Sequence, residues 1–293
     1  MAVREGYIDI GAYRIWYRSV GTEGIPLLAL HGGPGYPHDY LSSLEELADA
    51  GRRVVFYDQL GCGRSDRPHD PSLWRISYFV DEVAAVRRAL GLDQIHLLGQ
   101  SWGGMLAQEY ALGQPSGVCS LILASTSASM PLWAAEATRL RATLPAAVQA
   151  ILREHESAGT TDSPAYQEAM TAFYRRYVCR IYPWPEPFQR AEDTAGHEVY
   201  EAMWGPSEFH ITGSLRAWDR TSRLGEIRVP TLITCGRHDE ATPAMADVLR
   251  QGIAGSEMVV FEHSAHLAHL EETERYLRTI AAFLARVDRD AVA

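Results

Sequence analysis

The sequence contains no long hydrophobic segment. No stretch approaches the ~20 consecutive apolar residues that a membrane-spanning helix requires, which argues against an integral membrane protein of the helical type. Residues 1–19 (MAVREGYIDIGAYRIWYRS) also lack the apolar core and the small-residue cleavage site of a secretory signal. We therefore expect a cytoplasmic protein with no membrane partner.

Cysteine is scarce, and its positions are scattered. The four cysteines show neither CxxC spacing nor companion histidines; they are Cys62, Cys119, Cys179 and Cys235. This pattern excludes a disulfide framework and a zinc site, and it is typical of reduced thiols in a cytosolic protein. We expect the protein to need neither a metal nor a cofactor.

The chain also lacks a cluster of basic residues. It carries 27 Lys and Arg against 37 Asp and Glu, which gives a formal net charge of -10. Nucleic-acid binding needs clustered positive charge to neutralise phosphates, so a nucleic-acid partner is not expected. With 46% hydrophobic and 22% charged residues, the 293-residue chain has the composition of an ordinary globular protein.

Short apolar runs alternate with helical patterns toward both ends of the chain. A hairpin is expected over residues 7–10 and 13–19, and buried strands over 26–30, 54–57, 95–98, 118–124, 231–235 and 258–261. Helices are expected over 77–90, from about residue 105, near 243–251 and near 273–286. This alternation predicts an α/β fold, with a mostly parallel eight-stranded sheet and helices on both of its faces.

The middle of the chain has a different pattern. Residues 127–223 contain no run typical of a buried strand, and segments 134–154 and 164–177 show helical spacing. The stretch IYPWPEPF (181–188) is expected not to form a regular helix, because of its prolines. We therefore predict a helical cap domain over 127–225, inserted between two parts of an α/β core, 1–126 and 226–293.

A candidate nucleophile follows the predicted strand 95–98. Residues 99–103 read GQSWG, a Gly-x-Ser-x-Gly motif that also occurs by chance in glycine-rich chains. Its place between a strand and a helix is the context of a nucleophile elbow, in which a sharp turn exposes the serine hydroxyl. The motif in this context predicts Ser101 as the nucleophile of an α/β-hydrolase.

A serine nucleophile needs a base, and the base needs an acid to orient it. In the α/β-hydrolase order the acid and then the base follow the serine, each at the carboxyl end of a strand. Asp239 follows the predicted strand 231–235, and His263, His266 and His269 follow the strand 258–261. Spacing alone does not separate these histidines, although His266 is slightly favoured, and His238 is too close to Asp239 in sequence to bond it well.

The glycine-rich segment LALHGGPG (28–35) suggests an oxyanion hole. In this fold the loop after the third strand and the residue after the nucleophile each supply a backbone N–H, here from Gly33 and Trp102. A dinucleotide loop is excluded because GxGxxG is missing and Pro34 has no N–H to offer a phosphate. His31 is then expected to shape its loop, not to act as the base.

Taken together, these motifs resemble the proline iminopeptidase family of α/β-hydrolases, which remove an N-terminal residue. The matching segments are HGGPG (31–35), DQLGCGRS (58–65), GQSWGG (99–104), GRHDEATP (236–243) and SAH (264–266). They span nearly the whole chain in the family's order. The resemblance implies that His266 is the base. Arg64, in the DQLGCGRS loop, is expected to hold that loop together and not to take part in catalysis.

The resemblance also implies how the substrate amine is bound. Family members hold the cationic α-amine between a cap glutamate and the glutamate after the catalytic aspartate. In this chain the segment MWGPSEF (203–209) supplies Glu208, and Glu240 follows Asp239. Trp204 and Phe209, with Trp102, are expected to line the pocket for the N-terminal side chain.

The expected function is that of a serine aminopeptidase acting through an acyl-enzyme on an N-terminal Pro or another small or apolar residue. The expected substrate is a small peptide with a free amine, and the protein is expected to be a monomer or weak homo-oligomer. One alternative is a hydrolase that removes an aminoacyl group from a small molecule or natural-product intermediate. A second alternative is a general esterase or carbon–carbon hydrolase on the same fold, which would make no use of Glu208 and Glu240. A third is a non-catalytic receptor on the same fold, against which the intact triad and both oxyanion-hole elements argue.

Overall fold

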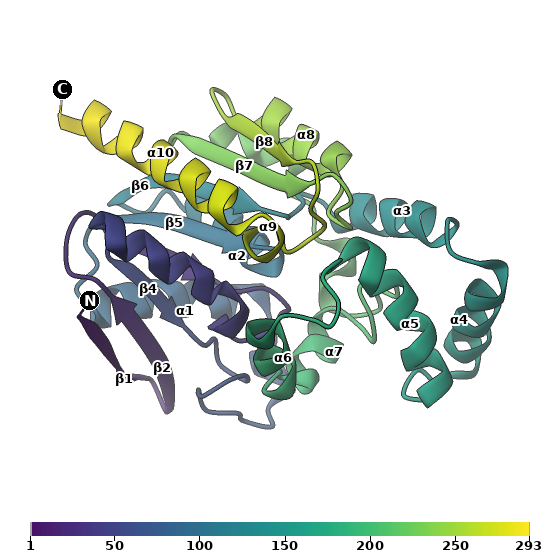
Figure 1. Cartoon of the computed structure of the whole chain (residues 1–293). Coiled ribbons are helices and arrows are strands. Elements are labelled where there is room, and N and C mark those ends of the chain that lie inside the picture. Colours follow the sequence, from purple (N-terminus) through teal and green to yellow (C-terminus); the bar gives the residue numbers. More distant parts are fainter. Residues whose placement is uncertain (1, 293) are drawn as a thin grey trace.

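A computed structural model describes residues 2–292 of the chain. Its centre is an eight-stranded sheet with the order β1-β2-β4-β3-β5-β6-β7-β8 (Figure 1). The strands are β1 (Val3–Ile10), β2 (Tyr13–Val20), β3 (Leu27–Leu30), β4 (Val54–Tyr57), β5 (Ile95–Gln100), β6 (Val118–Ala124), β7 (Thr231–Gly236) and β8 (Glu257–Phe261). The β1–β2 and β2–β4 pairs are antiparallel and all other pairs are parallel, which confirms the predicted mostly parallel sheet.

Both faces of the sheet are covered, because alternate residues of each central strand point to opposite sides. In β3, Leu28 and Leu30 belong to the core shared with α1 (Ile76–Ala89), α2 (Trp102–Leu112) and α8 (Pro243–Gly252). Leu27 and Ala29 belong to a second core, shared with the 3-10 helix η1 (His38–Ala50) and with α10 (Thr273–Val292). Burial on both faces explains why these strands are continuous apolar runs. The predicted α/β architecture is confirmed.

The segment between β6 and β7 is helical. It contains α3 (Met130–Arg141), α4 (Ala146–Ala158), α5 (Pro164–Tyr177), α6 (Glu186–Asp193), α7 (His197–Met203), η3 (Ser214–Ala217) and η4 (Thr221–Glu226). Figure 1 shows α3 to α7 gathered beyond one end of the sheet. We call residues 130–218 the cap segment.

The cap segment leaves and re-enters the core through two adjacent backbone stretches. Ser129 and Asp219 form an isolated antiparallel bridge, the Met130 N–H donates to the Trp218 carbonyl at 2.8 Å, and the Arg220 N–H donates to the Ala128 carbonyl at 2.7 Å. The division into core and cap domains stays a prediction. The predicted boundaries, 127 and 225, lie within a few residues of this bridge.

Prolines account for two differences between the expected and the observed helices. The single pattern predicted over 134–154 is two helices, since α3 ends at Arg141 and Pro145 is the N-cap of α4. The expectation that 181–188 contains no regular helix is wrong for its last residues. Pro185 caps α6, and Pro187 lies in its first turn, where a missing N–H breaks no helical hydrogen bond.

The remaining elements are short, namely η2 (Pro71–Leu73) and α9 (Ala268–Glu271). Within residues 2–292, no helix combines the length and apolar character that a membrane span would need.

Candidate active site

Ser101 lies in a sharp turn between β5 and α2. Its backbone has φ 57° and ψ −122°, a strained conformation for a residue with a side chain, and α2 begins at the next residue, Trp102, earlier than expected. A Cβ atom on Gly103 would lie 2.2 Å from the Leu30 carbonyl oxygen, so only glycine permits this approach of α2 to β3. The predicted strand-to-helix turn is present, and it presents the serine side chain at the carboxyl end of the sheet.

Asp239 and His266 meet although 27 residues separate them. The Asp239 carboxylate is buried and accepts hydrogen bonds from the N–H groups of Gly236 (3.2 Å) and Ala241 (2.8 Å). These bonds aim its Oδ1 at the His266 ring, whose Nδ1 lies 2.7 Å away. With Nδ1 bonded to Asp239, the other ring nitrogen, Nε2, is the one that can exchange a proton with a serine.

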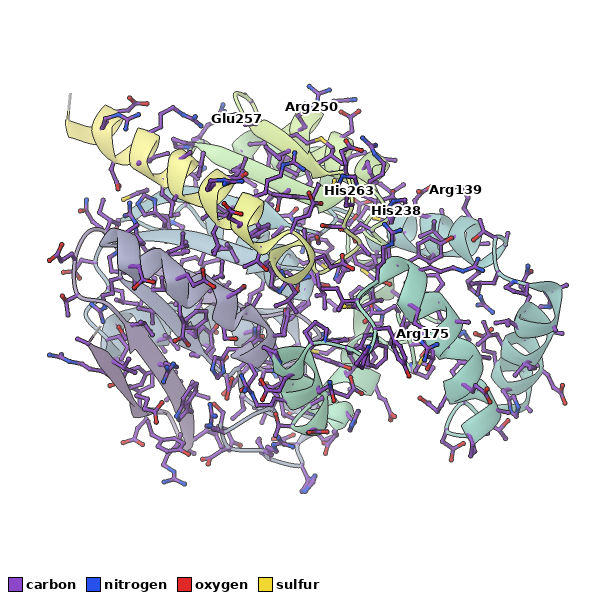
Figure 2. The ribbon with its side chains drawn as sticks, in the orientation of Figure 1. Arg139, Arg175, His238, Arg250, Glu257 and His263 are labelled. Carbon is purple, nitrogen blue, oxygen red and sulfur yellow. The ribbon has the colours of Figure 1, made fainter. Side chains whose placement is uncertain are left out.

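The other candidate histidines have different surroundings. The His269 ring donates from Nε2 to the Tyr40 carbonyl at 3.0 Å, and burial lowers its pKa to about 3. His263 and His238 are exposed on the outside of the molecule (Figure 2). Of the histidines considered from the sequence, the structure brings only His266 to Asp239.

The glycine loop after β3 is held by a side-chain network. The His31 Nε2 accepts from the Gln59 N–H at 2.9 Å, and burial lowers the pKa of His31 to about 4, so its ring is neutral. Gln59 donates back to the His31 carbonyl at 3.0 Å and accepts from the Trp102 indole N–H at 2.9 Å. His31 therefore shapes its loop, and the loop is tied to the residue that follows Ser101.

Gly33 and Trp102 have backbone N–H groups near the serine. Gly33 has φ +107°, a conformation that favours glycine, and it lines the same cavity as Ser101. Trp102 is the first residue of α2, where backbone N–H groups have no partner inside the helix. Its indole is buried in the core, so Trp102 contributes no side chain to the cavity.

Arg64 is held away from the reaction centre. Its backbone N–H donates to Asp58 at 2.9 Å, and its guanidinium lies over the Trp16 ring at 4.4 Å from the centroid. Asp58 also accepts from the His38 ring at 2.7 Å. These contacts close the DQLGCGRS loop on itself.

A cavity of about 410 Å³ lies between the sheet and the cap segment. Its polar lining includes Gly33, Gln100, Ser101, His266, Glu208 and Glu240. The rest of its lining is largely apolar: Tyr36, Tyr40, Tyr174, Val178, Phe188 and Leu267. The cavity is thus a small, mostly hydrophobic chamber with the serine, the histidine and two carboxylates on its wall.

Among the described residues, Glu208 and Glu240 have no Lys or Arg partner, and the basic group nearest to Glu240 is the His266 ring, whose Nε2 lies 3.8 Å from its Oε1. The Tyr200 hydroxyl donates to Oε1 of Glu208 at 2.7 Å, while Oε2 of Glu208 and both carboxylate oxygens of Glu240 are buried without a hydrogen-bond partner among the described residues. Burial raises the pKa of Glu208 to about 7. Burial, and then the charges of Glu208 and Asp239, raise the pKa of Glu240 well above its ordinary value. An unpaired buried carboxylate is costly, and a bound cation would remove that cost.

Trp204 and Phe209 lie behind the cavity wall and are not among its lining residues. Trp204 packs edge-to-face on Trp133 at 4.9 Å between ring centroids, and Phe209 packs on Phe173 at 4.8 Å. Trp133 donates from its indole to the Glu208 carbonyl at 3.2 Å, so this layer supports the segment that carries Glu208. The expectation that Trp204 and Phe209 line the pocket is corrected accordingly.

The aromatic residues that line the cavity lie outside the motifs found in the sequence; they are Tyr36, Tyr40, Tyr174 and Phe188. Tyr36 and Tyr40 directly follow the glycine loop, which is a usable signal for their position. Tyr174 and Phe188 come from α5 and α6, and only the folding of the cap segment over the sheet brings them to the serine. Among residues 2–292, no group of three or more His, Cys, Asp and Glu side chains is arranged to hold a metal ion.

Comparison with known proteins agrees with this geometry. Residues 25–273 match the family described as the alpha/beta hydrolase fold. A protein of Heyndrickxia coagulans named proline iminopeptidase is 44% identical over 283 residues, which cover 96% of this chain and 98% of that protein. The crystal structure of VinJ has a TM-score of 0.95 at 42% identity, covering 97% of this chain and 99% of that one. The crystal structure of proline iminopeptidase from Mycobacterium smegmatis has a TM-score of 0.91 at 40% identity, covering 98% of this chain and 100% of that one.

Proposed function

The chain belongs to the proline iminopeptidase family of α/β-hydrolases, and from this membership and the site geometry we propose that it hydrolyses the amide bond after an N-terminal residue. It is a serine hydrolase of the prolyl aminopeptidase type. The observation that carries the proposal is the pair of buried carboxylates, Glu208 and Glu240, which line the same cavity as Ser101 and His266 and of whose four oxygens three have no hydrogen-bond partner among the described residues. A general esterase has no need for such a pair.

The proposed reaction is acyl transfer. Ser101 Oγ attacks the carbonyl carbon of the N-terminal residue while His266 Nε2 takes the hydroxyl proton, and Asp239 stabilises the imidazolium. The oxyanion receives hydrogen bonds from the N–H groups of Gly33 and Trp102. His266 returns the proton to the leaving amine as the C–N bond breaks, and a water molecule then hydrolyses the ester in the same way.

Glu208 and Glu240 are proposed to bind the α-ammonium group. A carboxylate–ammonium hydrogen bond is charge-assisted, and in a buried cavity it is stronger than the same bond in water. Because Glu208 comes from the cap segment and Glu240 from the loop after β7, the amine would be held from two sides. This places the scissile carbonyl at a fixed distance from the amine, which suits an aminopeptidase and not an endopeptidase.

The apolar part of the cavity is proposed to hold the N-terminal side chain. Its aromatic and aliphatic lining favours Pro or another apolar residue. The name proline iminopeptidase that the relatives carry supports a peptide substrate for this chain over an aminoacylated small molecule. Trp204 and Phe209 are proposed to act indirectly, by supporting Glu208.

The test is a panel of prolyl- and alanyl-naphthylamides, each assayed with a free and an N-acetylated amine, beside short peptides. Wild-type protein should cleave the free-amine substrates, and Ser101→Ala should lose about 10⁴-fold or more in kcat. A fluorophosphonate should label wild-type protein and not Ser101→Ala. Full hydrolytic activity of Ser101→Ala would refute the assignment of the nucleophile.

A further inference from the structure

A chain of buried hydrogen bonds connects the three loops of the active site. The Gly32 N–H donates to the Tyr40 hydroxyl at 2.6 Å, and this hydroxyl donates to Oε1 of Gln100 at 2.5 Å. Nε2 of Gln100 donates to the carbonyl of His266 at 3.3 Å. The loop before Gly33, the residue before Ser101 and the backbone of the base are thereby linked.

We propose that Tyr40 and Gln100 are positioning residues that fix the oxyanion loop and His266 relative to Ser101. The proposal rests on the proposed function, because it assigns the two residues a role in the acyl-transfer step. Gln100 occupies a variable position of the Gly-x-Ser-x-Gly motif, Tyr40 lies outside the motifs, and neither residue belongs to the predicted triad. Both side chains are 2% exposed, and both line the cavity at the serine.

The direction of each hydrogen bond is determined by the chemistry of the groups. The Gly32 N–H can only donate, so the Tyr40 oxygen accepts from it and uses its own proton toward Gln100. Gln100 must then present its oxygen to Tyr40 and its NH₂ group to the His266 carbonyl. Each member has one orientation that satisfies its neighbours, which makes the chain a rigid spacer and not an adaptable one.

Close packing leaves the linked loops little freedom. A Cβ atom on Gly32 would lie 2.8 Å from Oε1 of Gln100, 2.9 Å from the Tyr40 hydroxyl and 3.1 Å from Cβ of Ser101. The Gly32 backbone is therefore in contact with all three side chains. A shift of the Tyr40 hydroxyl would move Gly32 and, with it, the neighbouring N–H of Gly33.

Tyr40 lines the cavity and is also held by contacts with His269. Its carbonyl accepts from the His269 ring at 3.0 Å, and the two rings pack with their centroids 5.5 Å apart. His269 is three residues after His266, so η1 holds the base loop both through Gln100 and through His269. This double attachment explains why a neutral buried histidine lies so close to the proposed base.

The test is Tyr40→Phe, which removes one oxygen atom and keeps the ring. We expect kcat on prolyl-naphthylamide to fall by about 10-fold to 100-fold while KM changes less than about twofold, because only the transition-state geometry is lost. The inhibition constant of pyrrolidine-2-boronic acid, which forms a tetrahedral adduct on the serine, should rise by about 10-fold or more. The dissociation constant of L-prolinol, which has the amine but no electrophilic centre, should stay within about twofold.

Tyr57→Phe is the matched control. Tyr57 is fully buried, and its hydroxyl has no hydrogen-bond partner in the described part of the chain, so its loss should leave kcat and the boronate inhibition unchanged. A second variant, Gln100→Met, removes both of the Gln100 hydrogen bonds and should reproduce the kcat loss of Tyr40→Phe. The double variant should lose less than the product of the two single losses, since the residues act as one unit.

The outcomes separate this proposal from the proposed function. If wild-type protein does not cleave prolyl-naphthylamide, the proposed function fails. If wild-type protein does cleave it and Tyr40→Phe keeps full kcat and boronate affinity, the positioning role alone is refuted. Unfolding of both Tyr40→Phe and Gln100→Met, judged by circular dichroism, would also refute it, because the chain would then serve stability and not positioning.

Discussion

Glu208 and Glu240 are the residues whose placement in the structure most needs a functional reason. Buried carboxylates are normally paired with a cation or fully hydrogen-bonded, because desolvation of an unpaired charge is unfavourable. Here three of their four carboxylate oxygens have no partner among the described residues. The free enzyme is therefore destabilised at a place where a bound ammonium would restore the lost interactions.

If Glu208 and Glu240 bind the substrate ammonium, amine binding should depend on pH. A carboxylic acid with a raised pKa holds its proton at low pH and cannot form an ion pair, and the pKa of Glu208 is about 7. The dissociation constant of L-prolinol, a secondary amine that stays cationic in this range, should therefore fall as the pH rises from 5.5 to 8. Glu208→Gln should bind more weakly and show a flatter profile in titration calorimetry.

Glu208 and Glu240 also determine how the stability of the folded protein should change with pH. Since the folded-state pKa values of Glu208 and Glu240 are raised, the folded protein binds more protons than the unfolded chain above about pH 4.5, and stability falls as the pH rises through this window. The Glu208→Gln, Glu240→Gln double variant should lose less stability than wild-type protein between pH 5 and pH 8. A difference of about 1–3 kcal/mol in the free energy of unfolding is expected from urea titrations. An identical decline in both proteins would contradict the placement of these carboxylates as unpaired groups.

At the level of single residues, sequence reasoning succeeds where a role is tied to a strand end. Asp239 and His266 could be found because each follows an apolar run whose carboxyl end must lie at one edge of the sheet. Trp204 and Phe209 could not be placed, because they lie in turns after α7 and a position in a motif does not tell which way a turn residue faces. Tyr40 and Gln100 carry no local signal of their hydrogen bonds, which join segments 60 residues apart.

Among the elements, the turn from β5 to α2 carries the strongest constraint. It requires α2 to touch β3, and Gly103→Ala would place a Cβ atom 2.2 Å from the Leu30 carbonyl oxygen. We expect this change to destabilise the fold by about 1–3 kcal/mol and to reduce kcat strongly, because the helix must shift away from the serine. Thermal unfolding and the naphthylamide assay measure the two effects.

Gly225→Ala is the control for this element. A Cβ atom at Gly225 would have no neighbour closer than 3.9 Å, so stability and kcat should both stay near the wild-type values. Equal behaviour of Gly103→Ala and Gly225→Ala would mean that the approach of α2 to β3 is not needed.

Elements of the core were predictable because burial on two faces gives apolar runs of strand length. The helices of the cap segment were harder to predict, because the helical spacing of apolar residues continues through the break between α3 and α4. A proline can cap a helix or end one, and its effect depends on the position it occupies. No element was expected over η1, although Leu41, Leu44 and Leu47 recur there at three-residue spacing and are buried.

On the scale of the whole molecule, the cap segment is attached directly to the proposed catalytic loops. The Tyr177 carbonyl, at the end of α5, accepts from the Glu240 N–H at 3.1 Å, and the Val178 carbonyl accepts from the His266 N–H at 3.1 Å. At its other side, the Gly196 N–H donates to the Gly35 carbonyl at 2.8 Å. The cap segment is thus hydrogen-bonded to the backbone of the proposed base, of Glu240 and of the glycine loop.

The central claim is that a glutamate of the cap segment and a glutamate of the core together hold one substrate amine. The most direct measurement is the ratio of kcat/KM for prolyl-naphthylamide to that for its N-acetylated form, in wild-type protein, Glu208→Gln and Glu240→Gln. We predict a high ratio in wild-type protein and a fall of at least about 30-fold in each variant, caused by loss on the free-amine substrate alone. An unchanged ratio, with equal losses on both substrates, would contradict the claim.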